Sequence, residues 1–166
     1  MVFATATAAP RPKTKNIATI SLLLACIFVV MAVGQLFSFE KFIPLLEDYQ
    51  LPGGYGTAVL TAGGLVTAEV FALPFLLRME LSPLMRITSM VCGWLVAAIW
   101  LFLVFWANVA PNSLMNIGLF GASVKLPVGW WAVLVVAALS ILAGWATWGM
   151  WPLRQVVKSA PKSLKK

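Results

Sequence analysis

The sequence contains no histidine, only two cysteines and few charged residues. Without histidine there is no histidine-ligated haem, no histidine-ligated zinc and no histidine general base, so most familiar membrane redox centres are excluded. Cys26 and Cys92 lie in separate apolar runs, and neither belongs to a CxxC pair or to another metal-ligand spacing. A disulfide framework is therefore not expected.

Apolar residues make up 61% of the 166 residues, whereas charged residues make up 10%. A soluble domain of this length carries more charge, so the composition places the chain in the membrane class. The net charge is +7, but eight of the twelve basic residues lie at 1–16 and 152–166. No basic face interleaved with aromatic residues is present, so we expect contact with membrane lipid and none with nucleic acid.

Four apolar segments are each long enough to cross a bilayer core of about 30 Å as a helix, at about 1.5 Å per residue. We therefore predict an all-α integral membrane four-helix bundle at 17–151, between a cytoplasmic tail at 1–16 and a basic cytoplasmic tail at 152–166. The predicted helices cover about residues 17–39, 57–77, 84–106 and 128–151. The segment at 40–56 leaves the membrane with room for a short interfacial helix, and 107–127 forms a longer loop.

The distribution of basic residues predicts the orientation. With both termini in the cytoplasm, ten basic residues lie inside and only Lys41 and Lys125 lie outside. The positive-inside rule therefore favours an N-in, C-in protein of a bacterial-type inner (plasma) membrane. Tryptophans near the helix ends, including Trp100 and Trp106, are typical of the membrane interface.

Glu69 is the only acidic residue well inside a predicted span. A carboxylate there costs about 2.5 to 3.5 kcal/mol on insertion scales, so Glu69 should face the bundle and either find a partner or stay protonated. Gln35, Thr61 and Ser89 are the partners within reach of such a position. Glu69 is then either a polar clamp between helices or a group that handles a proton, a quinone or a substrate.

Lys41, Cys26 and Cys92 are the remaining candidates. Lys41 directly follows the first span, where a lysine ordinarily extends toward the interface. Glu69 lies roughly 16 to 18 Å below the outer boundary, at about 1.5 Å per residue, so a Lys41–Glu69 ion pair requires a tilt or a re-entrant loop. The two cysteines lie at about the depth of Glu69, but a cysteine in apolar surroundings is usually inert packing.

The middle of the chain resembles the DoxX/MauE group of small four-helix membrane proteins. The resemblance rests on the run at 34–42, on the Tyr49-Gln50-Leu51-Pro52 loop and on Ala68-Glu69 in the second helix, and it spans roughly residues 34–145. It implies that Lys41 and Glu69 occupy the characteristic positions of the group. The Cys-Gly-Cys-Phe-Gly motif of the MauE branch corresponds here to 116–121, which keeps the glycines and Phe120 but has no cysteine.

The resemblance implies a redox-associated membrane subunit without haem that supports a quinone-linked or thiol-maturation partner. Without histidine, such a subunit needs a redox protein partner or a bound quinone to move electrons. The residues alone leave two alternatives open: a small proton-coupled transporter that uses Glu69, in which an oligomer builds the cavity, and a structural subunit of a larger membrane complex.

Overall fold

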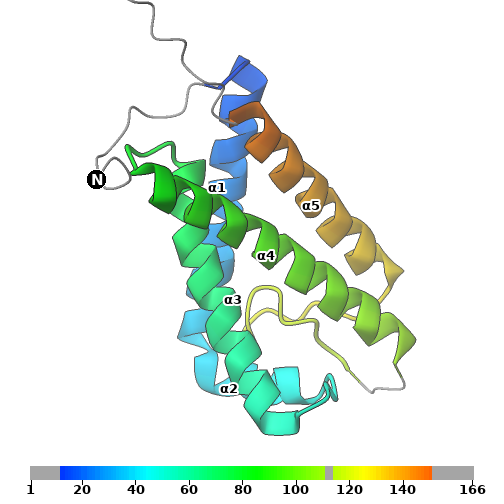
Figure 1. Cartoon of the computed structure of the whole chain (residues 1–166). Helices are drawn as coiled ribbons and strands as arrows, with labels where there is room; N and C mark the ends of the chain where they lie inside the picture. Colours follow the sequence, from blue (N-terminus) through cyan, green and yellow to red (C-terminus); the bar gives the residue numbers. More distant parts are fainter. Residues whose placement is uncertain (1–11, 111–113, 151–166) are drawn as a thin grey trace, which may run out of the picture.

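The structure is a computed structural model that describes residues 12–110 and 114–150. These residues form five helices (Figure 1), namely α1 (Lys15–Phe37), α2 (Phe39–Glu47), α3 (Gly54–Leu76), α4 (Pro83–Val109) and α5 (Trp130–Met150). The predicted tail at 152–166, and most of the tail at 1–16, lie outside the described residues. The all-helical class is confirmed, and the segment after the first span contains the short helix α2.

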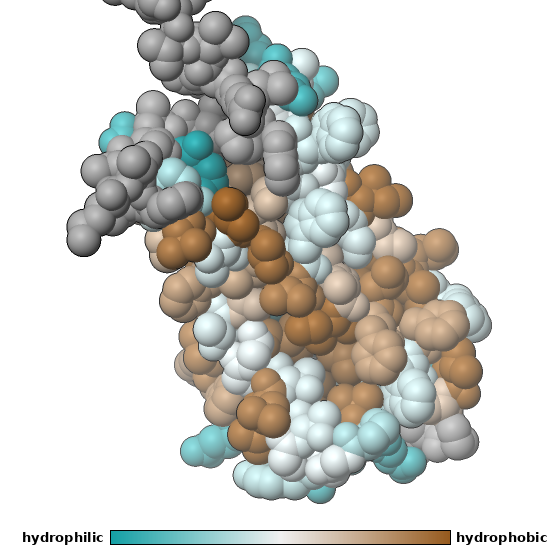
Figure 2. Space-filling model, in the orientation of Figure 1, coloured by the Kyte–Doolittle hydropathy of each residue, from teal (hydrophilic) through white to brown (hydrophobic). Residues whose placement is uncertain are grey.

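Four of the described helices, α1, α3, α4 and α5, are long and apolar enough to cross a membrane. They match the four predicted spans to within a few residues. The hydropathy of the surface agrees, because Figure 2 shows apolar side chains over the middle of the visible face and hydrophilic side chains near its two ends. The chain is therefore a multi-pass membrane protein.

Local sequence sets where the helices begin. The Thr14 hydroxyl accepts a hydrogen bond from the Ile17 amide at 3.4 Å, which caps the start of α1. The Ser82 hydroxyl caps α4 in the same way by accepting from the Met85 amide at 3.3 Å, and Pro83 follows it at the first helical position. Both are standard N-terminal helix signals.

The spanning helices close into a ring. α3 packs against α1 and α4, α5 packs against α4 and α1, and α2 lies against α3. The start of α1, the α3–α4 connection and the end of α5 lie at one end of the bundle, whereas α2 and the end of α4 lie at the other (Figure 1). Consecutive spanning helices are therefore antiparallel.

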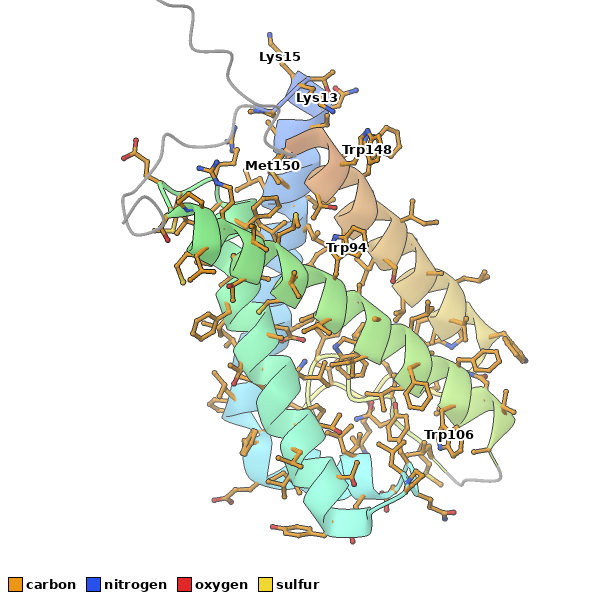
Figure 3. The ribbon with its side chains drawn as sticks, in the orientation of Figure 1. Lys13, Lys15, Trp94, Trp106, Trp148 and Met150 are labelled. Atoms are coloured by element: carbon orange, nitrogen blue, oxygen red, sulfur yellow. The ribbon has the colours of Figure 1, made fainter. Side chains whose placement is uncertain are left out.

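Lys13 joins the two ends of the described chain. Its amide donates to the Gly149 carbonyl at 3.3 Å, and its ammonium group donates to the Trp148 carbonyl at 3.4 Å. The ammonium group also lies 5.7 Å from the centre of the Trp148 ring (Figure 3). Such a cation–π contact favours the charged side chain over the aromatic face and holds the start of α1 against the end of α5.

The long loop between α4 and α5 folds back into the bundle, which the sequence analysis did not predict. Its residues 114–129 extend toward the middle of the molecule in Figure 1, and Ile117 and Leu119 are buried. The Asn116 side-chain oxygen accepts from the amides of Gly118, at 3.1 Å, and Leu126, at 2.9 Å. The Ile117 amide also donates to the Leu126 carbonyl, so the loop satisfies much of its own backbone.

Two glycines let this loop touch α1. Gly121 has a φ of +74°, and a β-carbon there would overlap the Gly34 carbonyl oxygen and the Ser38 hydroxyl. A β-carbon on Gly34 would lie 2.6 Å from the Phe120 carbonyl oxygen. The adjacent Ala122 amide donates to the Ser38 hydroxyl at 2.9 Å. The loop therefore packs backbone to backbone on the end of α1.

We predict that Gly121→Ala destabilises the protein strongly. The left-handed backbone alone costs an alanine about 1 to 2 kcal/mol, and the methyl group also displaces the loop from α1. Thermal unfolding of the detergent-solubilised protein measures this effect. Gly64→Ala is the matched control, because no heavy atom lies within 4 Å of the β-carbon it would add. An equal loss in both variants would contradict the packed position of the loop.

Candidate functional site

Glu69 lies at the centre of the bundle and is completely buried. Its Oε1 atom accepts a hydrogen bond from the Gln35 side-chain amide at 3.0 Å and another from the Trp100 indole N–H at 3.3 Å. The donors come from α1 and α4, which flank α3. The carboxyl group thus joins three spanning helices through neutral partners.

The loop at 114–129 provides a fourth wall of this site. The Gln35 amide nitrogen also donates to the Leu119 carbonyl oxygen at 3.2 Å. Both N–H groups of Gln35 are therefore used, one toward Glu69 and one toward the loop backbone. Gln35, like Glu69, is fully buried, so this amide is the link between the carboxyl group and the loop.

The face of α3 that contains Glu69 explains how the neighbouring helices come close enough to bind the carboxyl group. Residues three and four apart on this face are all buried, and three of the six are alanines; the face consists of Ala58, Ala62, Leu65, Glu69, Ala72 and Leu76. Small side chains allow neighbouring helices to approach closely. Donors on α1 and α4 can then reach the carboxyl group.

Two buried oxygen atoms of the site have no hydrogen-bond partner among the described residues. They are Oε1 of Gln35 and Oε2 of Glu69. Buried polar atoms normally have partners, so each such exception requires an explanation. In this site both exceptions are acceptors, and they belong to two groups that already share a hydrogen bond.

Ser89, one of the three partners of Glu69 considered from the sequence, does not bind Glu69. Its hydroxyl donates to the Phe71 carbonyl at 2.6 Å and accepts from the Phe75 amide at 3.0 Å. These backbone groups flank Pro74, which interrupts the hydrogen bonding of α3. Ser89 therefore repairs the proline-interrupted turn. Thr61 does not bind Glu69 either, and of the three only Gln35 does.

Lys41 does not pair with Glu69. Its side chain is exposed on α2, while the hydrogen bonds of the buried carboxyl group come from Gln35 and Trp100. The lysine therefore takes the surface position that is ordinary for a lysine beyond the end of a spanning helix. Lys41 on α2 and Glu69 on α3 therefore lie on neighbouring helices without contacting each other. These are the two positions that the resemblance to the DoxX/MauE group singles out.

The two cysteines do not join the site. Both are free, and Cys26 points outward from α1 while Glu69 points into the bundle. Cys92 is half-buried on α4 and packs at the edge of the apolar core. The structure therefore places one thiol at the outer face of the bundle and one against the core, and it brings neither to the carboxyl group.

Trp100 and Leu119 are the two members of the site that the sequence analysis missed. Trp100 was expected at the membrane interface, but it is among the largest fully buried side chains. Its distance from the end of α4, about two and a half helical turns, is the signal that separates it from Trp106. Leu119 contributes a backbone carbonyl, and a backbone group leaves no mark on the sequence.

A second set of hydrogen bonds holds the loop from the side of α2. The Tyr49 hydroxyl donates to the Ile117 carbonyl at 2.8 Å, and the Trp106 indole donates to the Tyr49 carbonyl at 3.0 Å. Burial raises the pKa of the Tyr49 hydroxyl, because the phenolate would lose its hydration. Tyr49 therefore remains a neutral donor to the loop.

Comparisons of the chain with protein-family models, with curated proteins and with solved structures gave no significant match.

We predict that Glu69→Ala lowers the free energy of unfolding by about 1 to 3 kcal/mol, because it leaves the buried N–H groups of Gln35 and Trp100 without their acceptor. Glu69→Gln keeps an acceptor of nearly the same shape and should stay close to wild type. Thermal unfolding in detergent, together with the abundance of each variant in the membrane, measures the difference. A glutamine variant as unstable as the alanine variant would show that the site holds an ionised, paired carboxylate.

Proposed function

We propose that this chain is a redox-associated membrane protein of the DoxX/MauE type that supports a quinone-linked partner in a bacterial-type inner membrane, with both termini in the cytoplasm. The observation that carries the proposal is the Glu69 site. Glu69 is the one acidic side chain buried within residues 12–110 and 114–150. Ionisable residues inside membrane bundles typically mark functional sites, which is why the proposal starts from Glu69.

The quinone-linked branch is favoured over thiol maturation by the positions of the cysteines. Thiol exchange requires an accessible thiolate next to a second thiol or an activating charge. Cys26 and Cys92 are both free, and the segment that corresponds to the cysteine motif of the MauE branch is a cysteine-free stretch packed in the bundle. The partner therefore has to provide any thiol chemistry.

A quinone carries electrons and protons together, so a supporting protein needs groups that hold protons. Glu69 is such a group, held at Oε1 by two neutral donors. Because the chain contains no histidine, electrons have to come from the redox partner rather than from a histidine-ligated centre. In this proposal the chain handles protons and positions the carrier, while its partner handles electrons.

A groove between α3 and α4 fits the chemistry of a quinone. Its volume is about 620 Å³, within the range of about 300 to 1,000 Å³ typical of small-molecule sites. The lining is mainly apolar and includes Leu60, Gly64, Ile99 and Phe102, which would hold a ring and an isoprenoid chain. Thr61 also lines the groove. Its hydroxyl is the group that would donate a hydrogen bond to a quinone carbonyl.

We predict that decylubiquinone binds the purified protein saturably and that Thr61→Val weakens the binding about three- to tenfold, the equivalent of one hydrogen bond. Quenching of tryptophan fluorescence in lipid nanodiscs measures the dissociation constant. Thr67→Val is the matched control, because Thr67 is an exposed threonine of the same helix that does not line the groove. Equal affinity in both variants would remove Thr61 from the site.

The same preparation separates the alternatives. Proton flux into liposomes that contain only this chain, without quinone, would contradict the redox proposal and identify a transporter that uses Glu69. If the protein shows neither quinone binding nor proton flux, it is a structural subunit.

A further inference from the structure

Among the described residues, the hydrogen bonds around Glu69 leave two buried polar atoms without a partner. Gln35 uses its two N–H groups on Glu69 Oε1 and on the Leu119 carbonyl, and Trp100 uses its single N–H on Glu69 Oε1. The two remaining atoms are Gln35 Oε1 and Glu69 Oε2, both buried acceptors without a donor among the described residues. A single proton shared between them would complete the set.

We propose that Gln35 and Glu69 form a proton-binding site that latches the loop at 114–129. With a proton on Oε2, Glu69 is a carboxylic acid whose hydroxyl donates to Gln35 Oε1. The Gln35 amide already donates to Glu69 Oε1 at 3.0 Å. A carboxylic acid and a primary amide each offer one donor and one acceptor on the same side, so the two groups then pair through two hydrogen bonds.

The orientation of the amide is determined by its surroundings. If the Gln35 side chain were turned over, its oxygen would face the Leu119 carbonyl, which is an acceptor whatever the protonation state of Glu69, and the two oxygen atoms would meet without a donor. The nitrogen therefore has to lie where it does. The amide oxygen, Gln35 Oε1, therefore lies on the other side, and it is the acceptor that needs the proton.

The donor set selects a proton rather than a metal ion. Hard cations such as Na⁺, Ca²⁺ and Mg²⁺ prefer several oxygen ligands, six or more for the divalent ions. This site leaves only two oxygen atoms over, and the described residues contain no group of three or more histidine, cysteine, aspartate or glutamate side chains that would hold a metal.

The latch works through the second N–H of Gln35. In the protonated site this N–H donates to the Leu119 carbonyl. When Glu69 loses its proton, Oε2 becomes a charged acceptor that competes for the same N–H, because hydrogen bonds to charged groups are the stronger ones. Gln35 then turns toward the carboxylate, Leu119 loses its donor, and the inner part of the loop is released.

Within residues 12–110 and 114–150, Glu69 receives its hydrogen bonds from neutral groups alone. α1 presents Gln35, α4 presents Trp100 and the loop presents the Leu119 carbonyl. The charged residues of α2 are exposed, as is Lys125 of the loop, and the half-buried Cys92 lies two helical turns from Trp100 along α4. Tyr49, which also holds the loop, stays neutral because burial raises its pKa.

Hydrogen–deuterium exchange of the full-length protein in nanodiscs tests the latch. Glu69→Gln is the comparison at every pH, because a glutamine provides a permanent N–H where the acid provides its proton. Intrinsic exchange rates are identical in the two proteins at a given pH, so only the opening of the loop differs. Peptides that cover residues 114–126 report the latch, and peptides from the first half of α4 report global stability.

We expect wild type and Glu69→Gln to exchange equally at low pH. As the pH rises, the loop of wild type should exchange up to tenfold faster for each pH unit, since one proton leaves on opening, while the loop of the glutamine variant stays protected. Gln35→Leu, which has no amide, should expose the loop at all pH values in both backgrounds. The α4 peptides should not change.

Three results would overturn the proposal: loop exchange in wild type that matches the glutamine variant at every pH, a rise that appears equally in α4, or a loop that stays protected in Gln35→Leu. The inference does not rest on the redox proposal, because the exchange experiment contains no quinone and no partner. A protein that fails to bind decylubiquinone would leave this latch unaffected.

Discussion

The structure depends on one constraint, which is that a carboxyl group in the middle of a membrane bundle has no water to bind. Glu69 must therefore receive its hydrogen bonds from the protein. The donors are an amide on α1 and an indole on α4, at 3.0 and 3.3 Å from the same oxygen. These two hydrogen bonds fix the positions of α1 and α4 relative to α3. The remaining contacts between the helices are mostly apolar, and apolar contacts are less directional than hydrogen bonds.

The loop between α4 and α5 follows from the same constraint. Once Gln35 donates one N–H to Glu69, its second N–H needs an acceptor in an apolar interior, and the Leu119 carbonyl provides it. Bringing a backbone carbonyl to that depth requires the loop to turn inward. Gly34 and Gly121 make this approach sterically feasible, and Asn116 satisfies amides that the turn would otherwise leave open. The loop is thus a structural part of the site rather than an external connection.

Hydropathy predicted the four spans to within a few residues, because the length of an apolar run is a direct consequence of bilayer thickness. The burial of Glu69 was predictable because a carboxyl group inside a span has to turn away from lipid and toward the bundle. Gln35 could be named only as one of three partners, since helix periodicity does not show which neighbouring helix packs on which face. Trp100 was assigned to the interface because tryptophans usually lie there, and the inward loop was missed because the group that matters is a backbone carbonyl.

The central claim is that Glu69 is held in the bundle as a neutral acid among neutral donors. Infrared difference spectroscopy between wild type and Glu69→Gln in nanodiscs tests this claim directly, because a protonated carboxylic acid has a carbonyl stretch well separated from the bands of a carboxylate. The account predicts a protonated-acid band that disappears in Glu69→Gln and shifts in Trp100→Phe, where one hydrogen bond to Oε1 is lost. A difference spectrum that contains only carboxylate bands across the pH range in which the protein is folded would contradict it.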